Sequence, residues 1–147
     1  MGIPTRLAGG AAAVAAGALP FLLGISPAGA ETKGTEHELD YEFTNNDGDS
    51  VVCHILGRST LTRPTGDPTF DATSETLIGV GTSCGASLTI TARYTDQDGH
   101  ARQSGADGLT FLTLRNDDVA SGYVATHRIT FLDCINFCTT SFDTRPK

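Results

Sequence analysis

Apolar and polar side chains alternate in short stretches along the chain. The alternation is clearest in residues 88–95, where Leu88 and Ile90 lie in the same phase. It recurs in residues 37–44, with Tyr41 in the apolar phase. A period of two places successive side chains on opposite faces of a strand. Both stretches are therefore predicted as half-buried β-strands.

Four further stretches favour strands: residues 51–56, 76–82, 109–114 and 123–134. The first of them is apolar in both phases, which is typical of a strand buried on both faces. Asp47 and Gly48 predict a type I′ hairpin turn, and residues 96–99 predict a second turn. No window has apolar residues at helical spacing. Six or seven short strands predict an all-β domain, a small antiparallel β-sandwich of immunoglobulin-like type, with an eight-stranded barrel as the alternative.

Residues 57–75 are rich in Thr, Pro, Gly and Asp, and this composition predicts one long loop. Loops longer than about 12–15 residues in compact domains are often functional. This loop contains Arg58, Leu61 and Arg63, which we take as the candidate binding residues. The peptide bond after Arg58 is also the candidate reactive bond of a protease inhibitor. A solvated loop without a role is the alternative, and residues 99–108 predict a second polar loop.

The N-terminus has the features of an export signal. A stretch rich in Ala, Gly and Leu follows Arg6, and Ala28 and Ala30 occupy the two small-residue positions of an A-x-A cleavage site. We predict that residues 1–30 form a signal peptide cleaved after Ala30. An uncleaved membrane anchor is the alternative, because roughly 20 apolar residues span a bilayer. The prediction leaves one exported domain, residues 31–147.

The net charge of the chain narrows the classes of partner that we expect it to bind. The 147 residues fit one domain, and 10 basic against 17 acidic side chains give a net charge of -7. Removal of Arg6 with the signal peptide makes the domain one charge more negative. This balance argues against nucleic acid and against an anionic membrane surface, because both require clustered Lys and Arg. The abundance of Ala, Gly, Thr and Asp, with eight arginines against two lysines, favours a bacterial source with a GC-rich genome.

All four cysteines lie after the predicted cleavage site, which is typical of proteins in an oxidising environment. Four cysteines allow three pairings. Cys134 and Cys138 would stand about 13 Å apart in a continuous strand, so a disulfide between them requires a turn. Cys53 and Cys84 then pair by exclusion, and both share the phase of core residues. A zinc site made by the two C-terminal cysteines with His54 or His127 is the alternative, although the spacing is not Cys-x-x-Cys.

Two motifs resemble functional sites in their letters alone. Residues 81–85 match the G-x-S-x-G elbow around Ser83, but that motif needs a helix after the serine, and strand-like alternation follows here. Residues 96–99 resemble a calcium loop, but Tyr94 and Gly105 fall where carboxylate ligands are required. We interpret both as turns, with an irregular calcium site between loops as an alternative to the second. No catalytic residue, metal ligand or cofactor is assigned.

Charged and titratable residues leave two further functional hypotheses open: an acidic binding stripe and a hydrolase. Glu36, Glu38, Asp40 and Glu42 form an acidic stripe, which is typical of an exposed edge strand and is also suited to a basic partner or cations. His127 lies in the inward phase of its stretch, where we expect a hydrogen-bonded core histidine. Because acidic residues are plentiful, a small hydrolase with dispersed carboxylates stays open.

The sequence therefore predicts a secreted, extracellular, disulfide-stapled domain that binds rather than catalyses. We expect it to act through the loop of residues 57–75 or through a sheet face, on an extracellular protein or a component of the cell envelope. A secreted protease inhibitor and a small secreted hydrolase are the alternatives. Nucleic acid is not expected as a partner, nor is a membrane after cleavage.

Overall fold

The computed structural model describes residues 30–79, 81 and 83–147. Almost all of the predicted signal peptide, residues 1–30, therefore lies outside the described residues. In the described part of the chain, no helix has the length and apolar character needed to cross a membrane. The described secondary structure consists of eight strands: β1 (Glu31–Thr44), β2 (Ser50–Arg63), β3 (Phe70–Ile78), β4 (Ala86–Thr95), β5 (Ala101–Leu109), β6 (Phe111–Val119), β7 (Ser121–Phe131) and β8 (Thr139–Thr144).

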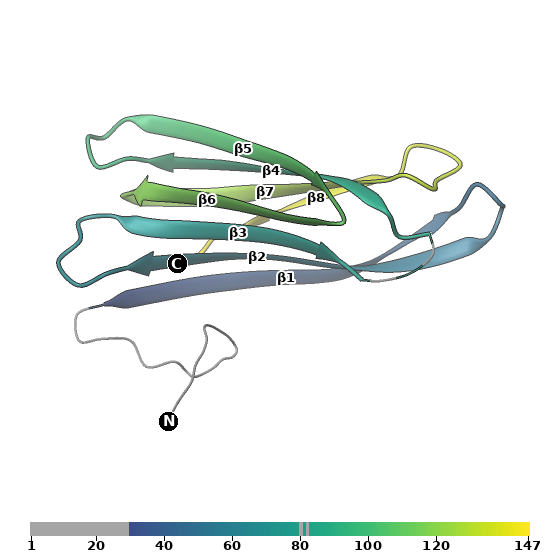
Figure 1. Ribbon diagram of the computed structural model, residues 1–147, viewed down its shortest axis with the longest axis horizontal. Helices are drawn as coiled ribbons and strands as arrows, with labels where there is room; N and C mark the ends of the chain where they lie inside the picture. The colour runs from purple at the N-terminus through teal and green to yellow at the C-terminus, as the bar shows by residue number, and fades with distance from the viewer. Residues whose placement is uncertain (1–29, 80, 82) are drawn as a thin grey trace, which may run out of the picture. The chain divides into compact units, whose positions relative to one another are not determined.

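The strands form two four-stranded antiparallel sheets that pack as a β-sandwich (Figure 1). The first sheet has the order β1-β2-β3-β6, and the second has the order β5-β4-β7-β8. The chain changes sheets after β3, after β5 and after β6. The predicted all-β sandwich is confirmed at this level.

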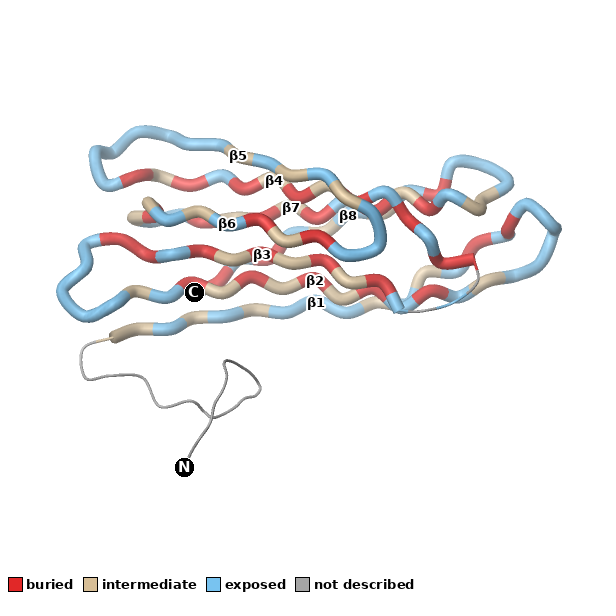
Figure 2. The backbone as a smooth tube through the Cα atoms, viewed as in Figure 1, coloured by how far each residue is buried: buried red, intermediate tan, exposed pale blue. Residues whose placement is uncertain are grey.

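The core lies between the inner faces of the two sheets. Along β4, Leu88, Ile90 and Ala92 are completely buried, whereas the intervening threonines are partly exposed. Figure 2 shows the same alternation of buried and exposed residues along most of the strands. The period-two pattern of the sequence thus identifies the inner face of this strand correctly.

The predicted long loop is wrong, because residues 57–63 belong to β2 and residues 70–75 belong to β3. The two segments pair with each other, with Arg58 opposite Glu75 and Leu61 opposite Ala72. Only residues 64–69 connect the two strands. Threonine is well suited to strands, and buried hydroxyls bond to one another inside the sandwich, so composition alone misled the prediction. The second predicted loop, residues 99–108, is mostly β5, which pairs with β4 along its whole length.

The two predicted turns adopt one geometry. In the first turn Gly48 has a φ of 88° and Asp47 has no positive φ, so the turn is not of type I′, which needs two positive φ angles. Asn45 Oδ1 accepts hydrogen bonds from the backbone N–H groups of Asp47 and Asp49. Asp96 accepts the corresponding pair in the second turn, where Gly99 has a φ of 83°. Both are hairpin turns closed by an Asx side chain.

Two disulfides join Cys53 to Cys84 and Cys134 to Cys138, with Cα–Cα distances of 5.7 and 6.1 Å. This pairing is the one inferred from the spacing of the cysteines. It removes the alternative zinc site, because all four thiols are oxidised. Disulfides of this kind are typical of proteins in an oxidising environment.

Candidate binding surface

The outer face of the first sheet carries a row of apolar side chains. Leu56 of β2 pairs with Leu77 of β3, and Leu77 pairs with Phe111 of β6. Their sequence neighbours Ile55, Ile78 and Leu112 are buried in the core, so these three side chains point outward. Directly opposed residues on neighbouring strands have Cβ atoms about 5 Å apart, so the three form a continuous apolar row.

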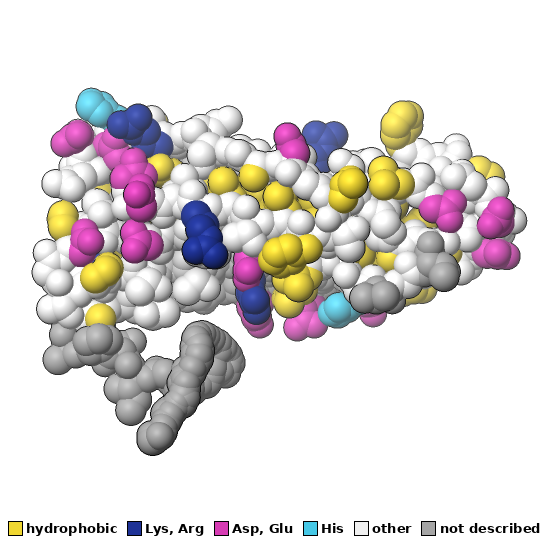
Figure 3. Space-filling view, viewed as in Figure 1, with side chains coloured by type: hydrophobic (Ala, Val, Ile, Leu, Met, Phe, Trp, Pro, Cys, Tyr) yellow, Lys and Arg dark blue, Asp and Glu magenta, His cyan; other side chains and the backbone are white. Residues whose placement is uncertain are grey.

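Phe111 is the most exposed member of this row, with 52% of its surface accessible. Leu56 and Leu77 are half-buried. Figure 3 shows hydrophobic side chains gathered over this sheet, with acidic side chains beside them. Exposed apolar side chains are common singly, but an apolar row across three strands is a feature of interaction surfaces.

The backbone just before Phe111 is strained. Thr110 has a φ of 67°, in the left-handed region that β-branched residues rarely adopt. Its N–H donates to the carbonyl oxygen of Ala86, and its own carbonyl oxygen accepts from the N–H of Ile78. These bonds fix the crossover from β5 to β6 and place Phe111 beside Leu77. Strained residues that the surrounding structure holds in place are concentrated at functional sites.

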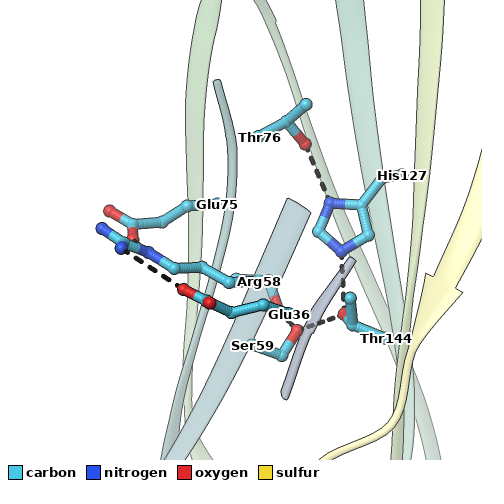
Figure 4. Close-up of polar contacts among 8 residues, drawn as sticks. Glu36, Arg58, Ser59, Glu75, Thr76, His127 and Thr144 are labelled. Carbon is cyan, nitrogen blue, oxygen red and sulfur yellow. Dashed lines mark hydrogen bonds and ion pairs between the residues drawn. The ribbon is translucent and has the colours of Figure 1, made fainter. Parts of the chain in front are cut away.

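An ion-paired row lies next to the apolar row. The Nε atom of Arg58 is 2.6 Å from Glu75 Oε1, and its Nη1 atom is 4.0 Å from Glu36 Oε2. Figure 4 shows Arg58 between these two carboxylates, while the next residue, Ser59, points to the opposite side of β2. The alternation of β2 thus separates a charged outer contact from a buried inner one.

The edge strand β1 contributes the acidic border, which we define as Glu36, Glu38, Asp40 and Glu42. All four are exposed. His54 of β2 bridges two of them: its Nδ1 atom is 2.8 Å from Asp40 Oδ1 and its Nε2 atom is 3.1 Å from Glu38 Oε2. The hydrogen bond to Asp40, together with the charges of both carboxylates, raises the pKa of His54. An imidazole that donates from both nitrogens is the charged form, so the border includes a pH-dependent positive group.

Behind this face, a chain of hydrogen bonds crosses the core. His127 Nδ1 lies 2.8 Å from Thr76 Oγ1, and His127 Nε2 lies 2.8 Å from Thr144 Oγ1 (Figure 4). The Thr144 hydroxyl is hydrogen-bonded to the Ser59 hydroxyl, which in turn is bonded to the Ser74 hydroxyl. The Ser74 hydroxyl is bonded to the hydroxyl of Tyr123, and the oxygen–oxygen distance is 2.6 Å in each of these three bonds. Every hydroxyl in this buried series of hydrogen bonds has a partner.

His127 is a structural histidine of the core. It is completely buried, and burial lowers its pKa to about 4. The ring of Phe142 stacks on it with centroids 5.0 Å apart. Phe142 fits because residue 57 is glycine, since a Cβ atom there would lie 2.2 Å from Phe142 Cε1. The imidazole is thus neutral, packed and fully hydrogen-bonded.

The motif around Ser83 forms no nucleophile elbow in the structure. Ser83 is buried, accepts from the side-chain amide of Asn45 and donates to Asp133 Oδ2 over 2.9 Å. The next described element is strand β4 rather than a helix. The serine side chain therefore joins the β1–β2 turn to the segment after β7.

Asp96, Asp98 and His100 approach one another closely enough to share a cation. However, Asp96 already accepts hydrogen bonds from two backbone N–H groups, and its Oδ2 atom lies 2.6 Å from Arg102 Nε. The bond to Arg102 is the main reason that the pKa of Asp96 is lowered. The carboxylate of Asp96 is committed to its own turn, so this group carries no metal assignment.

The structure separates the three binding residues proposed from the sequence. Arg58 lies on the outer face, Leu61 is buried in the core, and Arg63 lies over the ring of Phe70 at 4.9 Å. The bond after Arg58 is inside a paired strand with Ser59 fully buried, so it is not the exposed reactive bond of an inhibitor.

Sequence reasoning missed the apolar row, although one signal pointed to it. Residues 51–56 are apolar in both phases, and the prediction assigned both faces to the core. Only one face of β2 is covered by the second sheet.

Comparisons with protein-family models, curated proteins and solved structures give no match to this chain.

Proposed function

We propose that this chain is a secreted, non-catalytic binding module, and that the outer face of its first sheet is the surface that binds a protein partner. The observation that carries the proposal is the outward-facing apolar row, in which Leu56 and Leu77 are half-buried and Phe111 is exposed. Protein interfaces typically have an apolar centre surrounded by a polar rim. The apolar row is such a centre. Its polar rim, on the side toward β1, consists of Arg58, Glu75 and the acidic border.

The partner that fits this surface is a protein with apolar side chains flanked by Lys or Arg. The acidic border contributes four carboxylates against one histidine and one arginine. Complementary charge at the rim of an interface accelerates association and excludes partners of the wrong sign. Phe111 is the expected anchor, because aromatic side chains dominate binding energy when a partner buries them. We place this partner outside the cell, as a secreted protein or a component of the cell envelope.

Secretion is supported by two independent features. The stretch rich in Ala, Gly and Leu that ends at Ala28 and Ala30 has the composition of a signal peptide with its cleavage site. Two disulfides in a small domain favour an oxidising compartment.

The order of the strands supports an immunoglobulin-like topology for this sandwich. β2, β3 and β6 lie side by side as strands A, B and E do in an immunoglobulin domain, and β4, β7 and β8 lie as strands C, F and G do. β5 is placed beside β4, and β1 is an additional edge strand. The disulfide from β2 to Cys84 differs from the bridge between strands B and F found in antibody domains.

Site-specific photo-cross-linking tests the proposed surface. The full chain is expressed in the organism that encodes it, with p-benzoylphenylalanine in place of Phe111, and the secreted product is irradiated in the culture. We expect one predominant adduct with a basic extracellular or envelope protein. We also expect 0.5 M NaCl and the Glu38→Lys/Asp40→Lys variant to reduce its yield, because both weaken attraction at the rim.

The matched control carries the same photoreactive residue at Arg128, which is exposed on the outer face of the second sheet. The proposal fails if no adduct forms at position 111, if the same adducts form at position 128, or if charge reversal at positions 38 and 40 leaves the yield unchanged. Each variant is first shown to have the melting temperature of the unmodified protein.

A further inference from the structure

A cavity of about 420 Å³ is lined by residues from both sheets. Its lining residues belong to the end of the sandwich where β1, β3 and β7 begin, and Figure 1 shows where these strands start. Its volume is within the range of small-molecule sites, about 300–1,000 Å³. Its walls combine apolar core residues from four strands with two cationic side chains: Leu61, Phe70, Val119 and Tyr123, with Lys33 and Arg145. The outer-face apolar row is not part of it.

The apolar walls of the cavity are rigid. Phe70, Leu61, Val119 and Tyr123 belong to the packed core, and none is more than 7% exposed. The hydroxyl of Tyr123 is tied to Ser74 over 2.6 Å, so the ring cannot turn without breaking a buried hydrogen bond. Such walls need little ordering when a ligand binds, which favours affinity.

An irregularity in β7 forms another wall. The pairing of β4 with β7 changes register between Arg93 and Thr95, where Thr95 lies opposite Ser121. The next residue, Gly122, has a φ of 69° and also lines the cavity. Bulges of this kind interrupt a strand and are frequent beside binding sites. The irregular backbone and the cavity thus coincide in the first residues of β7.

The charged side chains that line the cavity are both cationic, whereas the chain as a whole is acidic. Lys33 and Arg145 line the cavity, and none of the described residues that line it is acidic, although the chain has 17 acidic and 10 basic side chains. Lys33 Nζ lies 5.1 Å from the centroid of the Phe70 ring, which brings its charge beside the apolar wall. Arg145 is bonded to Asp143 over 3.0 Å through one nitrogen, and a guanidinium has further N–H donors.

We propose that this cavity binds a small anionic amphiphile: one or two aromatic rings, or a short acyl chain, that carries a single carboxylate. The apolar body of the ligand lies against Phe70, Leu61 and Val119. Its carboxylate is held by Lys33 and Arg145. This site is independent of the protein-binding surface, because the two lie on different parts of the sandwich and share no residue.

Calorimetric titration of the secreted product of the full chain tests the site with two matched probes. 2-Naphthoate has the expected body and charge, and 2-naphthamide has the same body without the charge. We expect naphthoate to bind at least about tenfold more tightly than naphthamide, a difference that ionic recognition readily supplies. The Lys33→Gln/Arg145→Gln variant should lose this preference and still bind naphthamide as before.

Three further variants distinguish binding in the cavity from binding elsewhere on the protein. Ala120→Trp places a bulky side chain among the lining residues and should weaken both probes by at least about tenfold. Arg115→Gln/Arg128→Gln removes two exposed cations outside the cavity and should change neither affinity. Phe111→Ser should also leave both affinities unchanged, so that failure of the outer surface and failure of the cavity give different results.

The inference is overturned if naphthoate does not bind, if it binds no better than naphthamide, or if the preference survives loss of both cations. Matching thermal melting curves show that each variant is folded. If Ala120→Trp does not fold, the charge variant alone decides, because its residues are at the rim and leave the core intact.

Discussion

The two outer faces of this sandwich have different chemistry. On the second sheet, Thr89 and Thr91 point outward from β4, where Thr89 lies opposite Arg128 of β7 and Thr91 lies opposite Thr126. The hydroxyls of Thr89 and Thr126 donate to Asp107 and Asp143, and the hydroxyls of Thr130 and Thr139 bond to each other. On the first sheet, the corresponding outward positions include Leu56, Leu77 and Phe111. The inner faces of both sheets pack into the same core.

This difference shows what the fold itself requires. The second sheet demonstrates that threonine on the outer face is sufficient for a strand, because it suits a pleated, half-exposed surface. Leucine and phenylalanine on the first sheet add little to folding where no second layer covers them, and they increase the risk of association between edges. Their outward position is the observation on which the proposed partner rests.

The largest expected effect is on the inner faces. Ile90→Ala removes a completely buried side chain of β4 and should lower the free energy of unfolding by about 3–4 kcal/mol. Thr91→Ala, on the outer face of the same strand, should change it by less than about 0.5 kcal/mol. Urea denaturation measures both. Comparable losses from the two variants would show that the outer face of the second sheet is also structural.

Acid should destabilise the protein through its core. The pKa of His127 is lowered to about 4 from an ordinary value of 6.5, so the unfolded chain takes up this proton first as the pH falls. Stability should therefore be complete above pH 6.5 and decrease by about 3 kcal/mol between pH 6.5 and pH 4. Urea denaturation at several pH values measures the slope, and NMR titration of His127 supplies its midpoint. A midpoint near 6.5 would contradict the description of His127 as a neutral core residue.

The apolar row should contribute much less to stability than the core does. Leu77→Thr/Phe111→Ser replaces two outward side chains with polar ones, and we expect a change in the free energy of unfolding of less than about 1 kcal/mol. Ile55→Ala, on the inward side of the neighbouring strand, is the matched control and should lower it by about 3 kcal/mol. If the double variant loses as much as Ile55→Ala, the row is part of the fold rather than a binding surface.

The smallest expected effect is at the acidic border. The pKa of His54 is raised by Asp40 and Glu38, so its favourable contacts are complete below pH 6.5 and are lost as the pH rises through the higher folded value. In NMR titrations, Asp40→Asn should move the midpoint of His54 down toward 6.5. Glu42→Gln, which removes a border carboxylate bonded to Ser50, should leave it nearly unchanged. Equal shifts in the two variants would mean that the general charge of β1, not the contact to Asp40, sets the pKa.

Sequence patterns predicted those parts of the fold in which one strand alone carries the signal. The phase of residues 88–95 identified the inner face of β4, and cysteine spacing was sufficient for both disulfides. β8 was missed because Phe142 is its single large apolar residue. The half of β2 that contains Ser59 was predicted as a loop, because a polar side chain there does not look like a core residue in the local sequence. Ser59 is buried because its hydroxyl bonds to Ser74 and Thr144, which are 15 and 85 positions away in the chain.

The proposed binding surface depends on relations between strands that no single stretch of sequence contains. Residues 109–114 were predicted as one strand, yet Thr110 divides them between β5 and β6. Phe111 lies beside Leu77 only because the chain crosses from one sheet to the other at Thr110. The charged border was visible in the sequence as alternating acids, but its proximity to an apolar row follows from the order of the strands.

The most direct test of the outer surface is a competition experiment on the photo-adduct at position 111. The culture is irradiated in the presence of increasing amounts of unlabelled protein, either wild type or the Leu77→Thr/Phe111→Ser variant. Wild type should suppress the adduct, and the variant should compete at least about tenfold more weakly although it is folded, because it lacks the apolar anchor. Equal suppression by the two proteins would contradict the claim that this face binds the partner.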